Sequence, residues 1–473
     1  MAERTDADGT GTGTGDGTET GTGGAAPGRW RGRVRWLVPS GIALVVAGGL
    51  VAAITANTGY LPGFSVTTVW EARNDRPAAE HGNGAWLAGD TLVRSRFDAV
   101  TGFDVRKGTQ RWEYVPPGRA DVCAVSTAAD GGVALLVLGE VGTAEGKGEA
   151  CTTAAAIDLG TGRELWHTTR AAAYDDLASG ADLVATGAGL GVVLGVGDRR
   201  PDDPASPAGR ASAPGTARTA GDVRAFDLRT GAARWQAALP PGCSPRRVAV
   251  AARQVLAVLA CERSELRLAA FDPVDGRQRW LVPVEARRGV TGSAEVSFLS
   301  ADPVVLKVVE PEERGLRAFL SFSPEGRPQG RIDLTGGYGR IPKDRPAEVA
   351  VADGRLFAVA EYKSRASDWS RVVGFDLATG GEVWRADVAG SREDITGLHA
   401  GGGRVTAVAT NWKYRDELYV LDARTGEEQD DRWFRDDLGG HPNDFADLFV
   451  HQGLVIGVRW GEGVRPFSVY ERW

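Results

Sequence analysis

The chain repeats one short pattern roughly every fifty residues, and this repeat constrains the possible folds more than any other feature. The segments "FDLATGGEVW" (375–384), "FDLRTGAARW" (226–235) and "IDLGTGRELW" (157–166) share an Asp, a Gly four residues later, and a Trp four residues after the Gly. Repeats of this period are typical of folds in which each repeat forms one supersecondary unit and the units bury a core by stacking. The sequence therefore predicts a series of stacked, similar units.

Five copies of the pattern are complete and two are degraded. In "FSPEGRPQG" (322–330) Ser323 replaces the Asp and no Trp follows, whereas in "LDARTGEEQDDRW" (421–433) the Trp arrives three residues late. A Pro/Ala/Ser-rich insertion (199–221) lengthens one repeat and is expected to be a disordered loop. With a lone Trp near the start of the series, the repeat positions are Trp70, Asp104, Gly108, Trp112, Asp158, Gly162, Trp166, Asp227, Gly231, Trp235, Asp272, Gly276, Trp280, Asp376, Gly380, Trp384, Asp422, Gly426 and Trp433.

Short β-type runs separated by turn residues lie between the motifs, for example "RRVAVAA", "QVLAVLAC" and "LRLAAFD" after Trp235. Four short strands per repeat predict an all-β fold, the β-propeller, with one blade per repeat. The Thr-Gly pair suits the tight turn between the third and fourth strands, because Gly adopts positive φ without strain. The Asp is expected to accept hydrogen bonds from the turn amides, and the Trp to pack against the neighbouring blade.

The two ends of the repeat region complement each other. "VTTVWEAR" (66–73) reads as a single strand carrying Trp70, and residues 445–473 read as three strands without a fourth. We therefore expect Val66 to Ala72 to supply the outer strand of the last blade, which closes the ring and removes a sheet edge. This gives an eight-bladed propeller over residues 66–473, with seven blades as the alternative.

The repeated motifs resemble the tryptophan-docking repeats of the quinoprotein-type, or PQQ-like, β-propellers. That family contains PQQ-dependent dehydrogenases and also the non-enzymatic barrel-assembly lipoprotein of Gram-negative outer membranes. The resemblance covers nearly everything from about residue 66 onward. It implies the propeller fold and leaves both a catalytic and a binding function open.

The first 65 residues differ sharply in composition from the repeats. Residues 1–28 are Gly/Thr-rich and predict a disordered tail, and residues 29–36 are basic. The uncharged stretch 37–56 is long enough to form a transmembrane helix, and 57–65 reads as a linker. Because the arginines precede the span and the next cation is Arg73, the tail is expected in the cytoplasm and the propeller outside, anchored in the cell membrane. A cleaved signal peptide is the alternative.

Four cysteines are present, and an extracytoplasmic location would allow them to form disulfides. In the predicted topology all four fall on one face of the propeller, two in each of two blades. We predict the disulfides Cys123–Cys151 and Cys243–Cys261, with free buried thiols as the alternative.

No catalytic pattern stands out in the sequence. The net charge of -7 argues against nucleic-acid binding. PQQ-dependent dehydrogenases carry a pair of adjacent cysteines, which this chain lacks, and the acidic stretch 428–437 lacks the Gly and terminal Glu of a calcium loop. The five histidines show no HExxH-type metal spacing. We therefore assign no catalytic, metal or cofactor-binding residue.

One group of loops combines aromatic and basic side chains. The connections between the second and third strands of three successive blades read "YKSRASDWSR" (362–371), "NWKYRD" (411–416) and "RWGEGVR" (459–465). Such patches suit binding of a protein segment, a glycan or an anion, although capping of the blade ends is the structural alternative. The candidate binding residues are Trp369, Trp412, Tyr414, Trp460, Arg94 and Arg96.

The sequence thus predicts a membrane-anchored, extracytoplasmic propeller that acts as a non-catalytic scaffold for a protein or cell-envelope ligand. A PQQ-dependent or other propeller enzyme with an unrecognised site is one alternative. A sensory ectodomain that signals through the anchor is another, and it would require a cytoplasmic partner.

Overall fold

The computed structural model describes a large part of the predicted propeller region: residues 65–75, 81–140, 151–169, 183–195, 221–261, 265–364, 367–388, 394–410, 416–435, 445–461 and 463–472. Within these ranges no helix is long and apolar enough to cross a membrane. The predicted tail, basic segment and span (1–28, 29–36 and 37–56) lie outside the described residues, as does the insertion 199–221 except for Gly221. The membrane anchor therefore stays a prediction.

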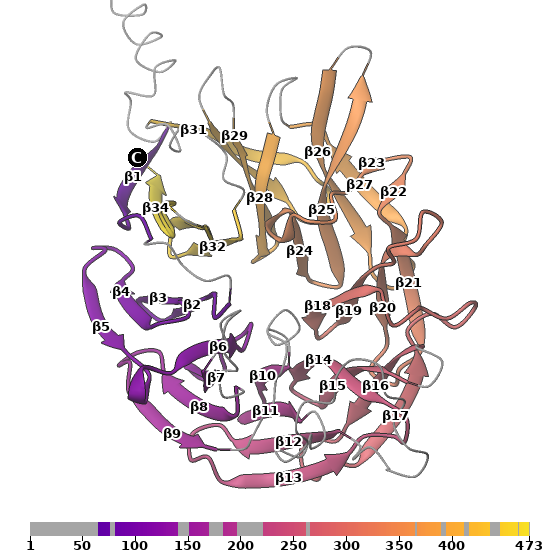
Figure 1. Ribbon diagram of the computed structural model, residues 1–473. Coiled ribbons are helices and arrows are strands. Elements are labelled where there is room, and N and C mark those ends of the chain that lie inside the picture. Colours follow the sequence, from indigo (N-terminus) through magenta and orange to yellow (C-terminus); the bar gives the residue numbers. More distant parts are fainter. Residues whose placement is uncertain are drawn as a thin grey trace, which may run out of the picture. The chain divides into compact units, whose positions relative to one another are not determined.

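The described chain is almost entirely β-structure, and its strands form antiparallel four-stranded sheets that follow one another along the sequence (Figure 1). Each set of four strands corresponds to one blade of the predicted propeller. The first five blades consist of β2 (Gly84–Ala88), β3 (Thr91–Ser95), β4 (Val100–Asp104) and β5 (Gln110–Tyr114); β6 (Asp121–Val125), β7 (Val133–Gly139), β8 (Thr153–Asp158) and β9 (Glu164–Thr168); β10 (Val184–Gly187), β11 (Leu190–Gly195), β12 (Asp222–Asp227) and β13 (Ala233–Ala238); β14 (Ser244–Ala251), β15 (Gln254–Ala260), β16 (Leu266–Phe271) and β17 (Gln278–Pro283); and β18 (Glu295–Ala301), β19 (Val304–Val309), β20 (Arg317–Phe322) and β21 (Pro328–Asp333).

The later blades have additional pairings. Strands β22 (Thr335–Gly336) and β23 (Gly339–Arg340) extend the blade formed by β24 (Val349–Ala352), β25 (Arg355–Ser364), β26 (Ser367–Asp376) and β27 (Glu382–Ala386). The blade formed by β28 (Asp394–Gly401), β29 (Arg404–Thr410), β30 (Glu417–Asp422) and β31 (Glu428–Phe434) shares an eight-stranded sheet with β1 (Ser65–Glu71), β32 (Asp447–His451), β33 (Leu454–Val458) and β34 (Phe467–Arg472).

The N-terminal strand completes the last blade, as the sequence predicts. The order β32-β33-β34-β1 places β1 at the outer position, where it pairs antiparallel with β34 from Val66↔Arg472 to Glu71↔Ser468. The predicted range, 66–72, differs from the observed strand by one residue at each end. In addition, β1 pairs in parallel with β31, which the sequence did not predict.

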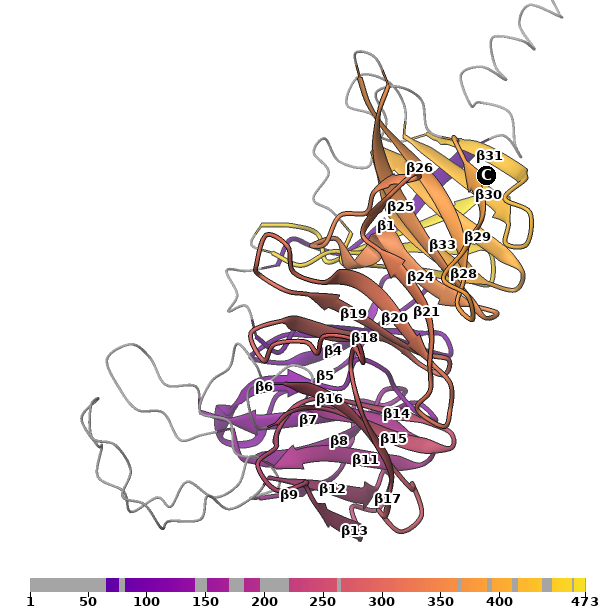
Figure 2. The same ribbon diagram turned by 90° about the vertical axis from the view of Figure 1, so that its right-hand side faces the viewer.

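Alternation of strand direction gives the propeller two faces. The turns that join strands one to two and three to four of each blade form one face, the turn face. The connections from strand two to three, and from one blade to the next, form the other, the loop face. The β25–β26 connection belongs to the loop face, and Figures 1 and 2 both show this hairpin projecting from its blade.

The Trp of each complete motif docks on the turn of the following blade. The indole of Trp384, for example, lies against Gly426 and donates its Nε1–H to the carbonyl oxygen of Ala423 at 3.1 Å. Gly426 has φ +75°, and a Cβ there would lie 2.6 Å from the indole, so the turn requires Gly for two reasons. Equivalent indole hydrogen bonds join Trp70 to Val105, Trp166 to Leu228, Trp235 to Pro273, and Trp280 to Pro324.

The Asp of the motif fixes the shape of the same turn. Asp227 Oδ1 accepts hydrogen bonds from the amides of Arg229 and Thr230 and from the Thr230 hydroxyl. Together with Arg234, these donors hold the pKa of Asp227 at about 2. The structural roles predicted for the Asp, Gly and Trp are confirmed at these positions.

Two blade-to-blade joints lack the Trp and use the main chain instead. Gly330 lies where the Trp of β21 would be, and its amide donates to the carbonyl oxygen of Leu377 at 3.1 Å, joined there by the Ser321 hydroxyl. At the other joint, β31 pairs with β1, and the amide of Arg435 donates to Val66 O at 2.8 Å.

The assignment of Trp433 to the repeat is therefore wrong. In complete motifs the Trp pairs with the residue two before the Asp, as in Ala225↔Trp235. The residue two before Asp422 is Val420, and it pairs with Asp430. Trp433 lies three residues further along β31, opposite Ser65 of β1, so that it belongs to the main-chain joint.

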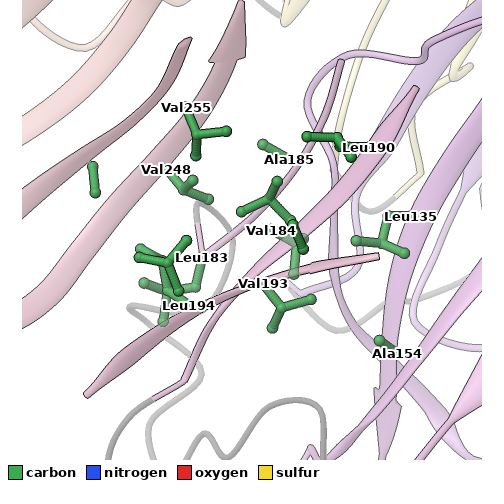
Figure 3. Packing of buried hydrophobic residues seen from close by; sticks show 14 of the residues in the cluster. Leu135, Ala154, Leu183, Val184, Ala185, Leu190, Val193, Leu194, Val248 and Val255 are labelled. Atoms are coloured by element: carbon green, nitrogen blue, oxygen red, sulfur yellow. The ribbon is translucent and has the colours of Figure 1, made fainter. Parts of the chain in front are cut away.

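Apolar residues fill the space between neighbouring blades. In Figure 3, Val184 and Val193 of β10 and β11 lie between Leu135 on one side and Val248 on the other, and all four are buried. Since both surfaces of each sheet are covered in this way, the central strands are apolar throughout, as in "LLVL" of β7.

Both predicted disulfides are present. Cys123–Cys151 joins the start of β8 to β6, with the Cα atoms 6.2 Å apart. Cys243–Cys261 joins the residue before β14 to the residue after β15. Each disulfide lies within one blade, on the loop face.

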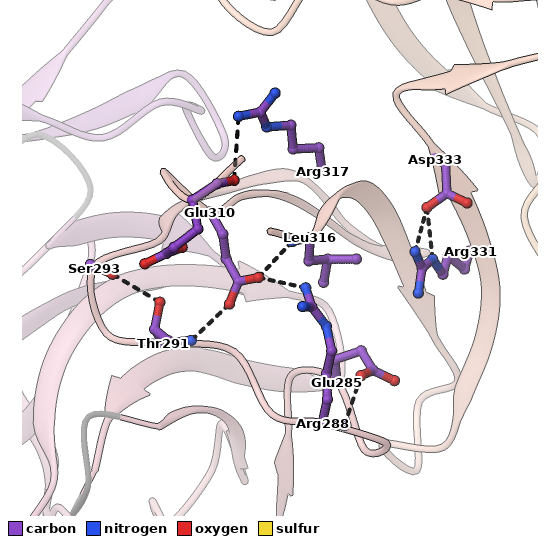
Figure 4. A network of polar contacts seen from close by, with 10 residues as sticks. Glu285, Arg288, Thr291, Ser293, Glu310, Leu316, Arg317, Arg331 and Asp333 are labelled. Carbon is purple, nitrogen blue, oxygen red and sulfur yellow. Dashed lines mark hydrogen bonds and ion pairs between the residues drawn. The ribbon is translucent and has the colours of Figure 1, made fainter. Parts of the chain in front are cut away.

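A buried carboxylate ties together two connections on the loop face (Figure 4). Glu310 is 4% exposed and accepts hydrogen bonds from the amides of Thr291 and Leu316, and from Arg288. Burial acts to raise the pKa of Glu310, but the amide donors and Arg288 outweigh it, so the pKa lies below its usual value. The carboxylate thus holds the loop before β18 and the loop after β19 together.

We expect Gly426→Ala to destabilise the chain more than Gly354→Ala. Both residues have positive φ, but a Cβ at 354 meets nothing within 4 Å, whereas at 426 it meets the Trp384 indole. The backbone cost is about 1–2 kcal/mol for either variant, and overpacking adds roughly 1–3 kcal/mol at 426 alone. Urea unfolding of the two variants measures the difference, and equal losses would show that the indole contact does not matter.

Glu310→Gln should lower the free energy of unfolding by about 1–3 kcal/mol at pH 7, because a charged acceptor of three hydrogen bonds is lost. A carboxylate with a lowered pKa stabilises the fold above its unfolded pKa of about 4.3, and this contribution disappears as the pH falls through the folded pKa. The difference between wild type and variant should therefore shrink below about pH 4. Urea unfolding at pH 7, 5 and 3.5 tests this, and a constant difference would contradict it.

Candidate functional site

The predicted binding residues divide into two clusters and a pair outside the described residues. Trp412 and Tyr414 fall in 411–415, which the structure does not describe. Trp460 lies two residues after the end of β33 and forms a cluster with Arg94 and Arg96, whereas Trp369 lies on β26. Within the described ranges, each cluster has its own contacts.

Trp460 and Arg94 form a stacked pair between the last blade and the first. The guanidinium carbon of Arg94 lies 4.2 Å from the centre of the Trp460 ring. Arg94 is 3% exposed; its Nη2 bonds Asp75 Oδ2 at 3.0 Å and Asn83 Oδ1 at 2.9 Å. The main chain fixes Asp75, whose amide donates to Val464 O at 2.9 Å.

The charges around this pair are already compensated. Arg96 lies between Asp75, at 3.4 Å, and Asp98, at 3.0 Å. Burial lowers the pKa of Arg94 below its ordinary value, and the nearby Asp75 carboxylate opposes this effect. A ligand anion would have to displace Asp75, so the geometry favours a structural cross-link over an anion site here.

The second cluster surrounds Trp369 on the projecting hairpin. Trp369 pairs across the hairpin with Tyr362, and their ring centres lie 6.4 Å apart. The guanidinium carbon of Arg371 lies 3.3 Å from the centre of the Tyr362 ring, and Arg371 forms an ion pair with Asp387, with Nε 2.8 Å from Asp387 Oδ1. Tyr362 thus contacts both Arg371 and Trp369, and the Tyr362–Trp369 pair lies nearer the hairpin tip than Arg371 does.

Neighbouring segments brace the base of the hairpin. Strand β27 pairs only with Val372 to Phe375 of β26, so the Trp369 half extends beyond it. On the other side β23 pairs with β25 through Arg340↔Glu361, and Arg340 also forms an ion pair with Glu361. The hairpin thus holds its aromatic side chains away from the blade core on a supported arm.

The sequence identified Trp369 but missed Tyr362 and Arg371 as its partners. The signal was present, because Tyr362 and Trp369 are equally distant from the centre of the hairpin in "YKSRASDW". Cross-strand pairing follows from such symmetry once the turn position is known. In the described part of the chain, no three His, Cys, Asp or Glu side chains are grouped so that they could hold a metal ion.

Solved structures with similar folds include BamB from Moraxella catarrhalis, at 14% sequence identity and a TM-score of 0.45, covering 86% of this chain and 99% of that one. They also include two quinohemoprotein alcohol dehydrogenases. ADHIIG from Pseudomonas putida HK5 is 12% identical, with a TM-score of 0.49, covering 87% of this chain and 77% of that one. The Comamonas testosteroni enzyme is 13% identical, with a TM-score of 0.46, covering 88% and 77%.

A search of the curated proteins finds no match to this sequence. The family model described as outer membrane protein assembly factor BamB matches three segments, residues 47–241, 209–310 and 368–456, which together span more than half of the chain. The predicted PQQ-like repeat is thereby confirmed. The chain belongs to this family of PQQ-like β-propellers, the family of the outer membrane protein assembly factor BamB.

Proposed function

We propose that the chain is a non-catalytic scaffold that binds a protein partner through its loop face, and that the hairpin carrying Tyr362, Trp369 and Arg371 is the principal contact. The observation that carries this proposal is the stacked aromatic-basic cluster on a braced arm. Aromatic and Arg side chains dominate the binding energy of protein interfaces. Membership in a family named for an assembly factor supports a protein as the partner.

The cluster is also pre-organised for binding. Long side chains lose rotamer entropy when a partner immobilises them, at a cost of about 0.5–1.5 kcal/mol each. Here the stacking of Arg371 on Tyr362 and its ion pair with Asp387 already restrict the hairpin side chains. A partner therefore meets a surface that loses little further freedom.

We propose an eight-bladed ring as the body of this scaffold. Eight sets of four strands, the last completed by β1, support eight blades over the seven-bladed alternative. The docking of Trp70 on Gly108 also supports closure, because it links the last blade to the first.

We further propose that residues 37–56 anchor the propeller in the cell membrane, with the tail cytoplasmic and the propeller outside. The uncharged stretch and the preceding arginines support this orientation. Two disulfides on the loop face fit an oxidising compartment. A partner bound there would be another extracytoplasmic protein held near the membrane surface.

An aromatic photo-crosslinking amino acid, p-benzoylphenylalanine, placed at position 369 of the full-length chain in the living source cells, keeps a ring at the contact and tests the scaffold proposal. We expect one discrete crosslinked protein, because Trp369 lies at the contact. The matched control places the same crosslinker at Val274, which is 84% exposed on the turn face. A companion variant, Trp369→Ser, should weaken co-purification of that protein at least about tenfold, as expected for an aromatic hot spot.

Three results would overturn the proposal. Equal crosslinking from positions 369 and 274 would show that the hairpin has no special role. Dye reduction by the purified chain with PQQ and calcium would instead establish the enzymatic alternative. A crosslinked cytoplasmic protein captured from the tail, with none at 369, would favour the sensory alternative.

A further inference from the structure

A pocket of about 440 Å³ opens on the turn face, between the blade β14–β17 and the blade β18–β21. Its lining includes the indole of Trp280, the amide of Gln254, and the side chains of Arg253 and Asp302. The loop-face clusters described above lie on the opposite face of the propeller. The pocket therefore belongs to neither of them.

The pocket exists where the repeat is degraded. In the complete motif the turn runs from Asp272 to Gly276, and the Gly amide donates to the carbonyl four residues earlier. In the degraded copy the Gly326 amide donates to Ser323, only three residues earlier. This shorter turn covers less of the docking Trp. The hydrogen bond from Trp280 Nε1 to Pro324 O is accordingly exposed, whereas the corresponding bond of Trp384 is buried.

Gln254 is the polar group that most clearly lacks a partner there. It is 5% exposed and lines the pocket, yet within the described residues its side-chain amide makes no hydrogen bond. The neighbouring Arg279 is already engaged with Asp272 and with the carbonyl of Arg253. The amide therefore faces the pocket and is available to a ligand.

From this arrangement we propose that the pocket is a saccharide subsite. The amide of Gln254 offers two donors and an acceptor, Arg253 offers donors, and Asp302 offers acceptors. The uncovered part of the Trp280 indole offers an apolar surface for the C–H face of a sugar ring. A sugar ring has hydroxyl groups at its edge and an apolar face, and it therefore matches these four side chains.

Other ligand classes fit less well. An apolar ligand would remove water from the Gln254 amide without replacing the hydrogen bonds that the amide makes to water. An ion of either sign would face two like charges, because the lining combines Arg253 and Arg279 with Asp302 and Glu325. These four side chains are exposed, so that water screens their charges. The pocket therefore best fits a neutral ligand that both donates and accepts hydrogen bonds.

The test uses the full-length chain labelled with 5-fluorotryptophan, held in a detergent without sugar headgroups, and followed by ¹⁹F NMR. Trp280→Phe assigns the Trp280 resonance, and Trp235→Phe assigns that of the intact neighbouring joint. Titration with N,N′-diacetylchitobiose, maltose and mannose should shift the Trp280 resonance saturably for at least one sugar and leave Trp235 unchanged. Gln254→Leu should weaken that binding about threefold to tenfold, since one or two hydrogen bonds are lost.

Gln278→Leu is the matched control, because Gln278 is exposed on the same strand as Trp280 and lies outside the pocket lining. The Gln278→Leu variant should bind the sugar with the affinity of the wild type. Arg253→Ala, an exposed position that the fold tolerates, should also weaken binding. The proposal is overturned if no sugar shifts Trp280, if Gln254→Leu and Gln278→Leu bind alike, or if glycine or a proline-rich peptide shifts Trp280 more strongly than any sugar. None of these results bears on the crosslinking at position 369.

Discussion

The contact between an indole and a glycine turn organises this propeller. An up-and-down four-stranded sheet has no built-in means of selecting its neighbour, because apolar faces pack without direction. The Trp supplies direction through one hydrogen bond to a fixed carbonyl, as from Trp166 to Leu228 O at 2.8 Å. The turn supplies a glycine whose missing Cβ leaves room for the ring. Each blade thus defines both the distance and the rotation of the next.

The joints without a Trp show which part of this contact is essential. At Gly330 the indole is absent, but a hydrogen bond to the equivalent carbonyl, that of Leu377, is kept by the main chain. At the junction of β31 and β1 the turn itself is absent, and the strands pair directly. In both cases the carbonyl or strand edge that would otherwise remain unsatisfied finds a donor. A hydrogen bond to that backbone group is present at these joints, and the indole is one way to supply it, although Trp112 docks on Gly162 without such a bond.

This distinction also explains which features the sequence could predict. The motif has fixed spacing, so the turns, the disulfide pairs and the closing strand around Trp70 could all be assigned without coordinates. Trp433 was misassigned because a main-chain joint carries no residue preference that a pattern could reveal. Arg94 and Arg96 were predicted as binding residues, but their carboxylate partner Asp75 comes from a connection with no repeat pattern. Which side chains pair across long loops depends on tertiary structure that periodicity does not encode.

The same reasoning separates the two faces in functional terms. On the turn face the motif determines the turns between the third and fourth strands, and these turns change where the motif is broken. The Ser323–Gly326 turn is such a break, and the pocket lined by Gln254 lies beside it. On the loop face no motif limits the connections, and the hairpin of β25 and β26 lengthens without disturbing the docked joints. New surface features can therefore arise on the loop face by lengthening of a connection and at the motif turns by loss of a motif residue.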